Sequence, residues 1–168
     1  MNKRQTILYH GSQASDLKAI KPNPHNAVSK RPVVFATSDI CFALAMIYGT
    51  GDELAVSYFI DTNTHKEEMC IDELRPNASK LLEAPGYLYE VSEEGFYQDS
   101  ALSHVELVKD TEAEVVKVSK IDNILDELRK HKVAIVKYED VPKEMERRGK
   151  EIGKPKNPYA PDRFKDVE

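Results

Sequence analysis

The chain has 168 residues, of which 40% are hydrophobic and 32% are charged, and its formal net charge is −5 at pH 7. This length and composition indicate one globular domain with a sizeable buried core, and they exclude a disordered, fibrous or collagen-like chain. The negative charge disfavours general binding to nucleic-acid backbones, because such binding depends on clusters of cations, although a local basic groove remains compatible with it.

The apolar runs and the two cysteines bear on the cellular compartment. The longest apolar run is residues 40–48, whereas a helix that crosses a bilayer needs about 20 apolar residues. No apolar segment follows the basic residues near the start, so we expect no secretion signal, no membrane partner and a cytoplasmic protein. Cys41 and Cys70 belong to no C-x-x-C or Cys/His pattern, so we expect reduced, buried thiols and neither a disulfide nor a zinc site.

The first expected element is a strand over residues 6–10 that leads into His10, Gly11 and Ser12. Gly at a strand end lets a ligand approach the backbone, and His and Ser offer directional hydrogen bonds to a polar ligand. A His in this position also suits a turn or an ordinary hydrogen-bonded polar group. A short helix is expected over residues 15–20, followed by a proline-containing loop that could cover a site.

The second strand is expected over residues 31–36, where an apolar run begins after a proline. The Thr-Ser-Asp segment at residues 37–39 offers good N-cap side chains for a helix over residues 40–48. Gly49 stands where a residue with left-handed backbone usually ends a helix. Because almost no face of this helix is polar, we expect it to be buried.

The middle of the chain predicts two more strands, separated by less regular segments. Residues 54–60 form an apolar run typical of a strand, and the charged residues 61–68 follow it. Residues 71–82 are expected to be loop and a short helix. Residues 87–91 alternate between large apolar and other side chains, which predicts a further strand.

Two short strands are expected over residues 105–108 and 113–118, joined by a polar link of four residues. A link of this length and polarity predicts a hairpin. Residues 121–128 keep the spacing of an amphipathic helix, and residues 133–138 form the last expected strand. About seven strands and three or four helices in irregular order indicate an α+β fold.

The composition changes near the end of the chain. Residues 1–141 are expected to form the domain, whereas residues 142–168 are highly charged and then rich in proline. This second segment predicts a surface helix followed by an extended tail.

Three segments stand in an order that is typical of one enzyme superfamily. They are L-Y-H-G-S at residues 8–12, V-V-F-A-T at residues 33–37 and H-V-E-L-V at residues 104–108. The pattern resembles the ADP-ribosyltransferase-like superfamily, in the branch of diphtheria toxin and the poly(ADP-ribose) polymerases, as a divergent member. The resemblance covers residues 6–138 and implies an ADP-ribosyltransferase-like split antiparallel or mixed β-sheet with flanking helices.

The resemblance implies that NAD is a substrate held in a cleft. The side chain of His10 and the backbone of Gly11 would hold the adenosine ribose and the nicotinamide amide. Phe35 would stand near the position of the tyrosine that stacks on nicotinamide in that family, although Val34 replaces the tyrosine itself. The residues expected to bind NAD are Tyr9, His10, Gly11, Ser12, Arg31, Phe35, Thr37, Ser38 and Tyr48.

Two of these residues also have simpler explanations. The guanidinium of Arg31 could clamp a pyrophosphate through two hydrogen bonds, but an Arg beside a proline is also an ordinary solvated strand start. Tyr48 could supply the stacking ring that Val34 does not, or it could be a core residue like most of the other tyrosines.

Glu106 matches the late acidic residue of the family. Cleavage of the bond between ribose and nicotinamide develops oxocarbenium-like charge, which a nearby carboxylate stabilises. Glu106 could equally be an outward-facing residue of a half-buried strand. Glu90, Glu112 and Glu114 remain alternatives for the functional carboxylate.

We therefore expect NAD-dependent transfer of ADP-ribose to an acceptor, protein or nucleic acid, that the sequence does not identify. One alternative is an inactive nucleotide- or protein-binding module of the same fold, which the missing tyrosine favours. A second is RNA 2′-phosphotransferase-like chemistry, which the single Arg31 and the net charge of −5 disfavour. No Gly-rich phosphate loop or G-x-S-x-G elbow occurs, and the histidines lack the spacing of metal ligands.

Overall fold

The computed structural model describes residues 6–24, 31–49, 51–61 and 63–152. Its strands are β1 (Ile7–Ser12), β2 (Ala19–Ile20), β3 (Val34–Thr37), β4 (Leu54–Ile60), β5 (Glu67–Glu73), β6 (Gly86–Ser92), β7 (Glu106–Lys109), β8 (Ala113–Ile121) and β9 (Ala134–Val136). Its helices are α1 (Ile40–Tyr48), α2 (Ile124–Lys130) and α3 (Val141–Ile152), with two short 3₁₀ helices, η1 (Ala78–Leu82) and η2 (Tyr138–Asp140).

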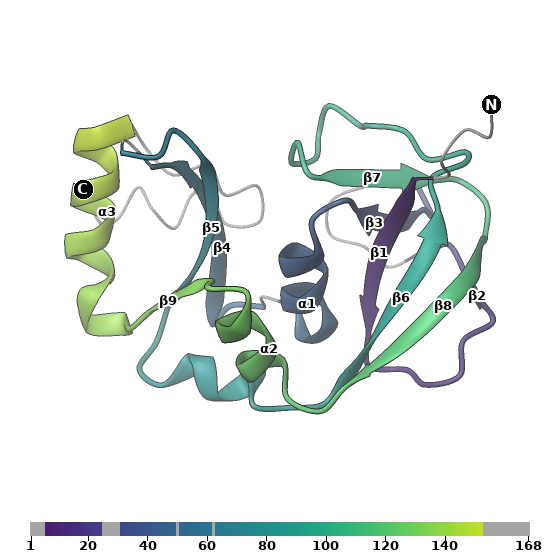
Figure 1. Cartoon of the computed structure of the whole chain (residues 1–168), viewed down its shortest axis with the longest axis horizontal. Coiled ribbons are helices and arrows are strands. Elements are labelled where there is room, and N and C mark those ends of the chain that lie inside the picture. Colours follow the sequence, from purple (N-terminus) through teal and green to yellow (C-terminus); the bar gives the residue numbers. More distant parts are fainter. Residues whose placement is uncertain (1–5, 25–30, 50, 62, 153–168) are drawn as a thin grey trace.

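The strands form two separate sheets (Figure 1). The larger sheet has six strands in the order β2-β8-β6-β1-β3-β7, and the smaller has three in the order β4-β5-β9. Helices α1 and α2 lie between the two sheets, and α3 covers the outer side of the smaller sheet (Figure 1). The irregular mixture of strands and helices confirms the α+β class.

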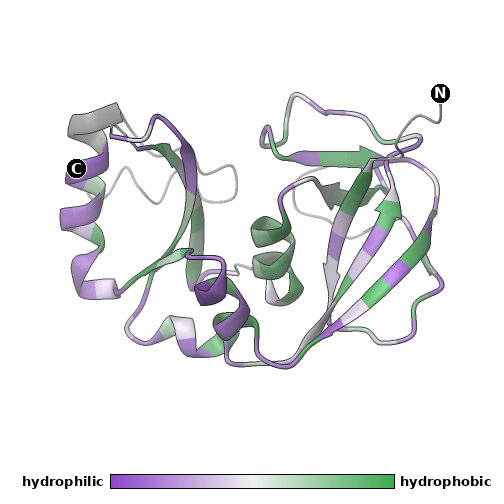
Figure 2. Cartoon of the chain, in the orientation of Figure 1, coloured by the Kyte–Doolittle hydropathy of each residue, from purple (hydrophilic) through white to green (hydrophobic). Residues whose placement is uncertain are grey.

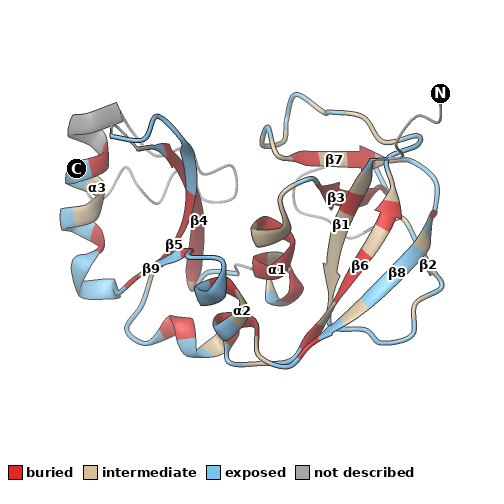
Figure 3. Ribbon diagram, viewed as in Figure 1, coloured by how far each residue is buried: buried red, intermediate tan, exposed pale blue. Residues whose placement is uncertain are grey.

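The main core lies between the sheets and has α1 at its centre. This helix is apolar along its length (Figure 2), and most of its residues are buried (Figure 3). Core residues outside α1 include Leu54, Val56, Ile71, Leu82, Leu88, Ile124, Leu125 and Leu128. Both sheets therefore contribute to one continuous core.

Two glycines let α1 approach the larger sheet closely. A Cβ atom built on Gly11 would lie 2.2 Å from the carbonyl oxygen of Ala43 and 2.7 Å from Cγ1 of Ile47. A Cβ atom on Gly86 would lie 2.2 Å from Cγ2 of Ile47. The missing side chain of Gly11 therefore makes room for the helix on this face of β1.

A second, smaller core covers the opposite face of the larger sheet. Its members are Leu8, Ile20, Val34, Ala36, Tyr89, Val91 and Ala113. Tyr89 is fully buried there, and its hydroxyl donates a hydrogen bond to the carbonyl of Ala14. This bond fixes the segment that follows β1.

The expected helix over residues 40–48 is confirmed as α1, with the expected ends. Asp39 is the N-cap, and its Oδ1 atom accepts hydrogen bonds from the amides of Cys41 at 2.9 Å and Phe42 at 3.5 Å. Gly49 follows the helix with a φ of 86°. A capping carboxylate and a terminal glycine therefore define this helix as its sequence indicates.

Most other expected elements are also confirmed, with shifted ends. The strands expected over residues 6–10, 31–36, 54–60, 87–91 and 133–138 correspond to β1, β3, β4, β6 and β9, and the helix expected over residues 121–128 corresponds to α2. Cys70 is buried as expected, whereas Cys41 is only partly buried, and neither forms a disulfide.

The prediction of a short helix over residues 15–20 is wrong. Asp16 has a φ of 58°, which is left-handed and does not continue a right-handed helix. Ala19 and Ile20 instead form β2, which pairs with Glu114 and Ala113 of β8. Pairing with a distant strand outweighs the weak local preference of these residues.

The prediction of a hairpin between residues 105–108 and 113–118 is also wrong. Both segments are strands, but β7 pairs with β3, whereas β8 pairs with β6 and β2. The polar link between them joins strands in different parts of the sheet rather than adjacent ones. A polar link indicates where a strand ends, but it does not identify the strand's partner.

Strand β5 was not expected, because the sequence places several carboxylates in it. Asp72 and Glu73 are both buried. The carboxylate of Glu73 accepts hydrogen bonds from the amides of Ser79 at 2.7 Å and Tyr138 at 3.1 Å. Buried carboxylates with such partners break the usual alternation of apolar and polar residues in a strand.

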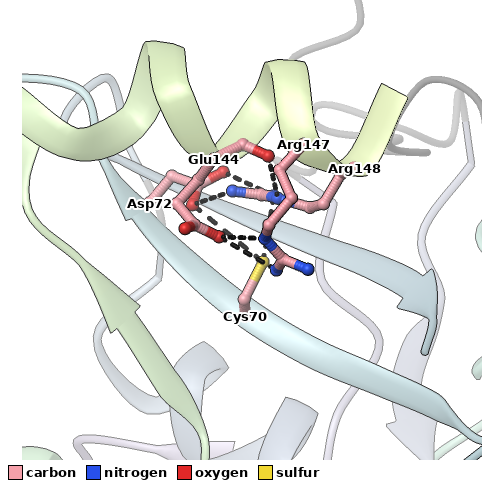
Figure 4. A network of polar contacts seen from close by, with 5 residues as sticks. All are labelled: Cys70, Asp72, Glu144, Arg147 and Arg148. Atoms are coloured by element: carbon pink, nitrogen blue, oxygen red, sulfur yellow. Dashed lines mark hydrogen bonds and ion pairs between the residues drawn. The ribbon is translucent and has the colours of Figure 1, made fainter. Parts of the chain in front are cut away.

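Helix α3 confirms the helix expected at the start of residues 142–168, while the proline-rich part beyond residue 152 lies outside the described residues. A buried cation holds this helix against β5 (Figure 4). Arg148 is 1% exposed and donates hydrogen bonds to both carboxylate oxygens of Asp72, at 2.9 and 3.2 Å. It also donates to Sγ of Cys70 at 3.1 Å.

Candidate functional site

Three neighbouring strands bring Tyr9, Thr37 and Glu106 into one row. Tyr9 of β1 pairs with Thr37 of β3, and Thr37 pairs with Glu106 of β7. Residues directly opposite each other in paired strands point to the same face of a sheet. Thr37 is 3% exposed and Glu106 is 4% exposed, so the row ends in a buried carboxylate.

His10 stands where β1 and β3 separate. Tyr9–Thr37 is the one register pair between these strands within the described residues. Beyond it, Nδ1 of His10 donates a hydrogen bond of 2.6 Å to the carbonyl oxygen of Phe35. The side chain of His10 thus joins two strands whose backbones no longer pair.

The same bond determines which ring nitrogen of His10 carries the hydrogen. A carbonyl can only accept, so Nδ1 carries the hydrogen, and Nε2 of the neutral ring is an acceptor. Burial lowers the pKa of His10, although the bond to the Phe35 carbonyl acts in the opposite direction. The ring is therefore neutral near pH 7 and suited to accept a hydrogen bond from a ligand hydroxyl.

His10 and Glu106 belong to opposite faces of the larger sheet. His10 pairs with Tyr89 of β6, which lies in the smaller core. Adjacent residues of a strand alternate between faces, so Tyr9 and Glu106 share the face that His10 does not. A ligand that contacts both His10 and Glu106 must therefore extend past the point where β1 and β3 separate.

The turn between β3 and α1 lies next to Thr37 and carries its own hydrogen bonds. Oγ1 of Thr37 accepts a hydrogen bond of 3.0 Å from the amide of Asp39. Oδ2 of Asp39 accepts a hydrogen bond of 3.1 Å from the hydroxyl of Tyr58, which comes from β4 of the other sheet. Ser38, which lies between Thr37 and Asp39 in the sequence, is exposed.

Burial and the charge of Asp39 set the protonation of two neighbours. Desolvation, followed by the charge and hydrogen bond of Asp39, raises the pKa of Tyr58, so this hydroxyl remains a donor. Desolvation and Asp39 also raise the pKa of Cys41 to about 11. Cys41 is therefore a neutral thiol near pH 7 and a weak nucleophile.

The segment before β7 also contacts the smaller sheet. The ring of His104 meets the ring of Tyr58 edge to face, with centroids 5.3 Å apart. Nε2 of His104 forms a hydrogen bond with Oε1 of Glu67 in β5. The amide of Glu106 donates to the carbonyl of Ser103 at 3.1 Å, so a turn leads directly into the carboxylate-bearing residue.

Arg31 lies at the other end of the β3–β7 pair from Glu106. It donates a hydrogen bond of 3.1 Å to Asp110, also bonds Tyr97, and lies 3.7 Å from Asp99. Asp110 is four residues beyond Glu106, which corresponds to about 13 Å along a strand. The structure therefore does not bring Arg31 together with Glu106, and two carboxylates balance its charge.

Tyr48 and Ser12 are the last residues of α1 and β1, beyond the Tyr9–Thr37–Glu106 row. Tyr48 is the last residue of α1 and 41% exposed, about 13 Å along the helix from its N-cap. Oγ of Ser12 accepts a hydrogen bond of 3.1 Å from the amide of Ala14. Phe35 is half-buried, and because it stands two residues before Thr37 it shares the face of the row.

The other candidate carboxylates have different surroundings. Glu90 pairs with Tyr9 and lies 3.9 Å from the ammonium of Lys117. Glu112 and Glu114 are exposed, in the link to β8 and on β8 itself. Glu106 is the one of these four that pairs with β3.

The sequence pattern did not indicate Tyr58 or Glu67 as neighbours of this site, and it placed His104 in the H-V-E-L-V segment without indicating its contacts with them. The hydrogen bond from the Tyr58 hydroxyl was not expected, because Tyr58 lies in an apolar strand and therefore resembles the other core tyrosines. His104 and Glu67 lie far apart in the sequence, and nothing in their spacing indicates that they meet. Asp39 was expected only as a helix cap.

The described residues contain no group of three or more His, Cys, Asp or Glu residues that could hold a metal ion. They contain no helix that is long and apolar enough to cross a membrane.

Comparison with known proteins gave no match: no family model, no curated protein and no solved structure resembles the chain at a significant level.

Proposed function

We propose that the chain has an ADP-ribosyltransferase-like split sheet, binds NAD and transfers its ADP-ribose to an acceptor. The observation that carries this proposal is the Tyr9–Thr37–Glu106 row, with His10 beside it at the separation of β1 and β3. Segments that are far apart in the sequence and that resemble the family's three motifs thus lie on adjacent strands. This placement supports a shared binding site.

The proposed chemistry assigns Glu106 to the reacting ribose. As the bond between C1′ and the nicotinamide nitrogen breaks, positive charge develops on the ribose ring. The carboxylate of Glu106 accepts a hydrogen bond from a ribose hydroxyl and stabilises that charge. Released nicotinamide takes the electron pair of the broken bond, the acceptor's nucleophilic atom then bonds to C1′, and its proton leaves to solvent.

His10 has a binding role in this proposal. Its neutral ring donates from Nδ1 to the Phe35 carbonyl, which leaves Nε2 to accept a hydrogen bond from a ribose hydroxyl. The fixed orientation of the ring reduces the entropy that is lost when the ligand binds. Because His10 and Glu106 lie on opposite faces, they contact different parts of the dinucleotide.

A second candidate is a module that binds a nucleotide without chemistry. Two observations favour it: only 4% of Glu106 is exposed, and Val34, where the family has its tyrosine, is 1% exposed in the smaller core. A substrate that reaches Glu106 must displace the groups that cover it. In contrast, the pairing of Arg31 with Asp110 and Asp99 gives no support to RNA 2′-phosphotransferase chemistry.

The test is nicotinamide release from NAD by the wild type and by Glu106→Gln. We expect the substitution to lower kcat about 100-fold or more, because it removes the charge that stabilises the transition state. Glu94→Gln is the matched control, since Glu94 is exposed in the turn after β6 and is not one of the candidate carboxylates. Circular dichroism checks that both variants keep the fold.

Each other outcome has a definite meaning. Heat or a thermal shift on adding NAD without nicotinamide release indicates the binding module. Absence of both binding signals at millimolar NAD overturns both candidates. Equal turnover by wild type and Glu106→Gln shows that another carboxylate acts.

A further inference from the structure

Tyr58 contacts both chain segments that carry the Thr37–Glu106 pair. Its hydroxyl donates to Oδ2 of Asp39, two residues after Thr37. Its ring meets the ring of His104, two residues before Glu106. Tyr58 belongs to β4 of the smaller sheet, whereas Thr37 and Glu106 belong to the larger one. One side chain therefore bridges from one sheet to the two segments that place the candidate site on the other.

The contact through Asp39 constrains the end of β3. Oδ1 of Asp39 caps α1, Oδ2 accepts from Tyr58, and the amide of Asp39 donates to Oγ1 of Thr37. Asp39 thus uses both carboxylate oxygens and its amide within this turn. Displacement of the Asp39 carboxylate would alter the turn and the orientation of the Thr37 hydroxyl with it.

The contact through His104 constrains the start of β7. The ring of His104 contacts the ring of Tyr58, and its Nε2 atom forms a hydrogen bond with Glu67. The amide of Glu106 closes a turn onto Ser103, which precedes His104. The smaller sheet therefore holds this turn from two strands, β4 through Tyr58 and β5 through Glu67.

The surroundings of Tyr58 indicate that it acts through its neighbours. The residue is 8% exposed, and its ring stacks on Phe42 of α1 with centroids 6.3 Å apart. With Phe42 and His104 against the ring and Asp39 on the hydroxyl, little of Tyr58 is open to a ligand.

We propose that Tyr58 is a positioning residue that fixes the location of the Glu106 carboxylate relative to Thr37, acting through Asp39 and His104. In its kinetic consequences this inference rests on the proposed function. A group that positions a carboxylate for the transition state affects kcat more than it affects the binding of NAD.

The kinetic test uses Tyr58→Phe, which keeps the ring and removes only the hydroxyl. We expect kcat for nicotinamide release to fall about two- to tenfold, the effect of losing one ordinary hydrogen bond, with KM for NAD unchanged. Tyr58→Leu should lower kcat further, because it also removes the ring contact with His104. Tyr138→Phe is the matched control, since Tyr138 is 47% exposed. An unchanged kcat, or a change in KM alone, would overturn the proposal.

Amide hydrogen exchange gives a second readout that does not depend on activity. In Tyr58→Phe, the amides of Asp39 and Glu106 should exchange faster, because both lie in turns that Tyr58 holds. The amide of Tyr89, in β6, should not change. If the wild type releases no nicotinamide, the proposed function fails and exchange alone decides the role of Tyr58. Unchanged exchange at both Asp39 and Glu106 then overturns the inference.

Discussion

At the scale of single residues, the close contact between β1 and α1 depends on glycine. Gly11 was expected to admit a ligand to the backbone, whereas in the structure helix α1 takes the space left by its missing Cβ. The nearest atom to a Cβ on Gly11 is a backbone oxygen, that of Ala43, whereas on Gly86 it is the side-chain atom Cγ2 of Ile47. A side chain can rotate away, but a backbone carbonyl in a helix cannot move without the helix.

This difference predicts that Gly11→Ala destabilises the protein more than Gly86→Ala. We expect Gly11→Ala to lower the free energy of unfolding by about 1–3 kcal/mol, the usual cost of forcing extra atoms into a packed core. Urea unfolding followed by circular dichroism measures both variants. Equal losses would mean that α1 shifts as easily as the Ile47 side chain rotates.

At the scale of elements, the buried ion pair between α3 and β5 is the main feature that hydrophobic patterning did not predict. Burial raises the pKa of Asp72, even though Arg148 donates to both of its oxygens and lowers it. A buried pair gains little over a well-packed apolar pair, but removing one partner leaves an uncompensated buried group. We therefore expect Arg148→Met to lower the free energy of unfolding by about 3–5 kcal/mol.

A double-mutant cycle in urea tests this prediction. Asp72→Leu combined with Arg148→Met should be more stable than Arg148→Met alone, because no buried charge remains unpaired. Arg147→Met is the matched control on the same helix, since the side chain of Arg147 is 43% exposed and bonds Glu144 at the surface. An equal effect of the Arg147 and Arg148 substitutions would contradict a dominant role for the buried pair.

The elements that the sequence predicted well are those whose signals are local. Helix α1 has its cap, its apolar run and its terminal glycine within a dozen neighbouring residues, and β1, β4 and β6 have apolar runs bounded by polar residues. Strand β5 was not predicted, because its buried carboxylates find their partners elsewhere in the sequence. These partners are the Arg148 guanidinium and the amides of Ser79 and Tyr138. Local patterns do not contain such partners.

The same limit applies to the candidate site. The sequence placed His10 and Thr37 at strand ends and Glu106 within a short strand, and strand pairing puts Thr37 opposite Glu106. It did not predict the pairing of β7 with β3, and it gave no sign that Tyr58 reaches Asp39 from the other sheet. Contacts between sheets depend on how helix α1 packs between them, which no single segment determines.

At the scale of the whole molecule, the two sheets share one core and should not fold independently. Ile71 of the smaller sheet and Leu88 of the larger one belong to the same buried cluster around α1. A continuous core of this kind is typical of one cooperative folding unit. The clearest test is a substitution in the smaller sheet with its effect measured in the larger one.

We predict that Ile71→Ala lowers the stability of both sheets together. Ile71 is 1% exposed, so the substitution leaves a cavity and should cost about 2–5 kcal/mol of unfolding free energy. Urea unfolding should show one transition, with the same midpoint by far-ultraviolet circular dichroism and by the NMR signals of Val118 in β8 and Ala134 in β9. Ile60→Ala, at an exposed position of β4, is the control and should change little. An earlier loss of the Ala134 signal than of the Val118 signal would show that the smaller sheet unfolds by itself, and the candidate site would then depend on a separable part of the molecule.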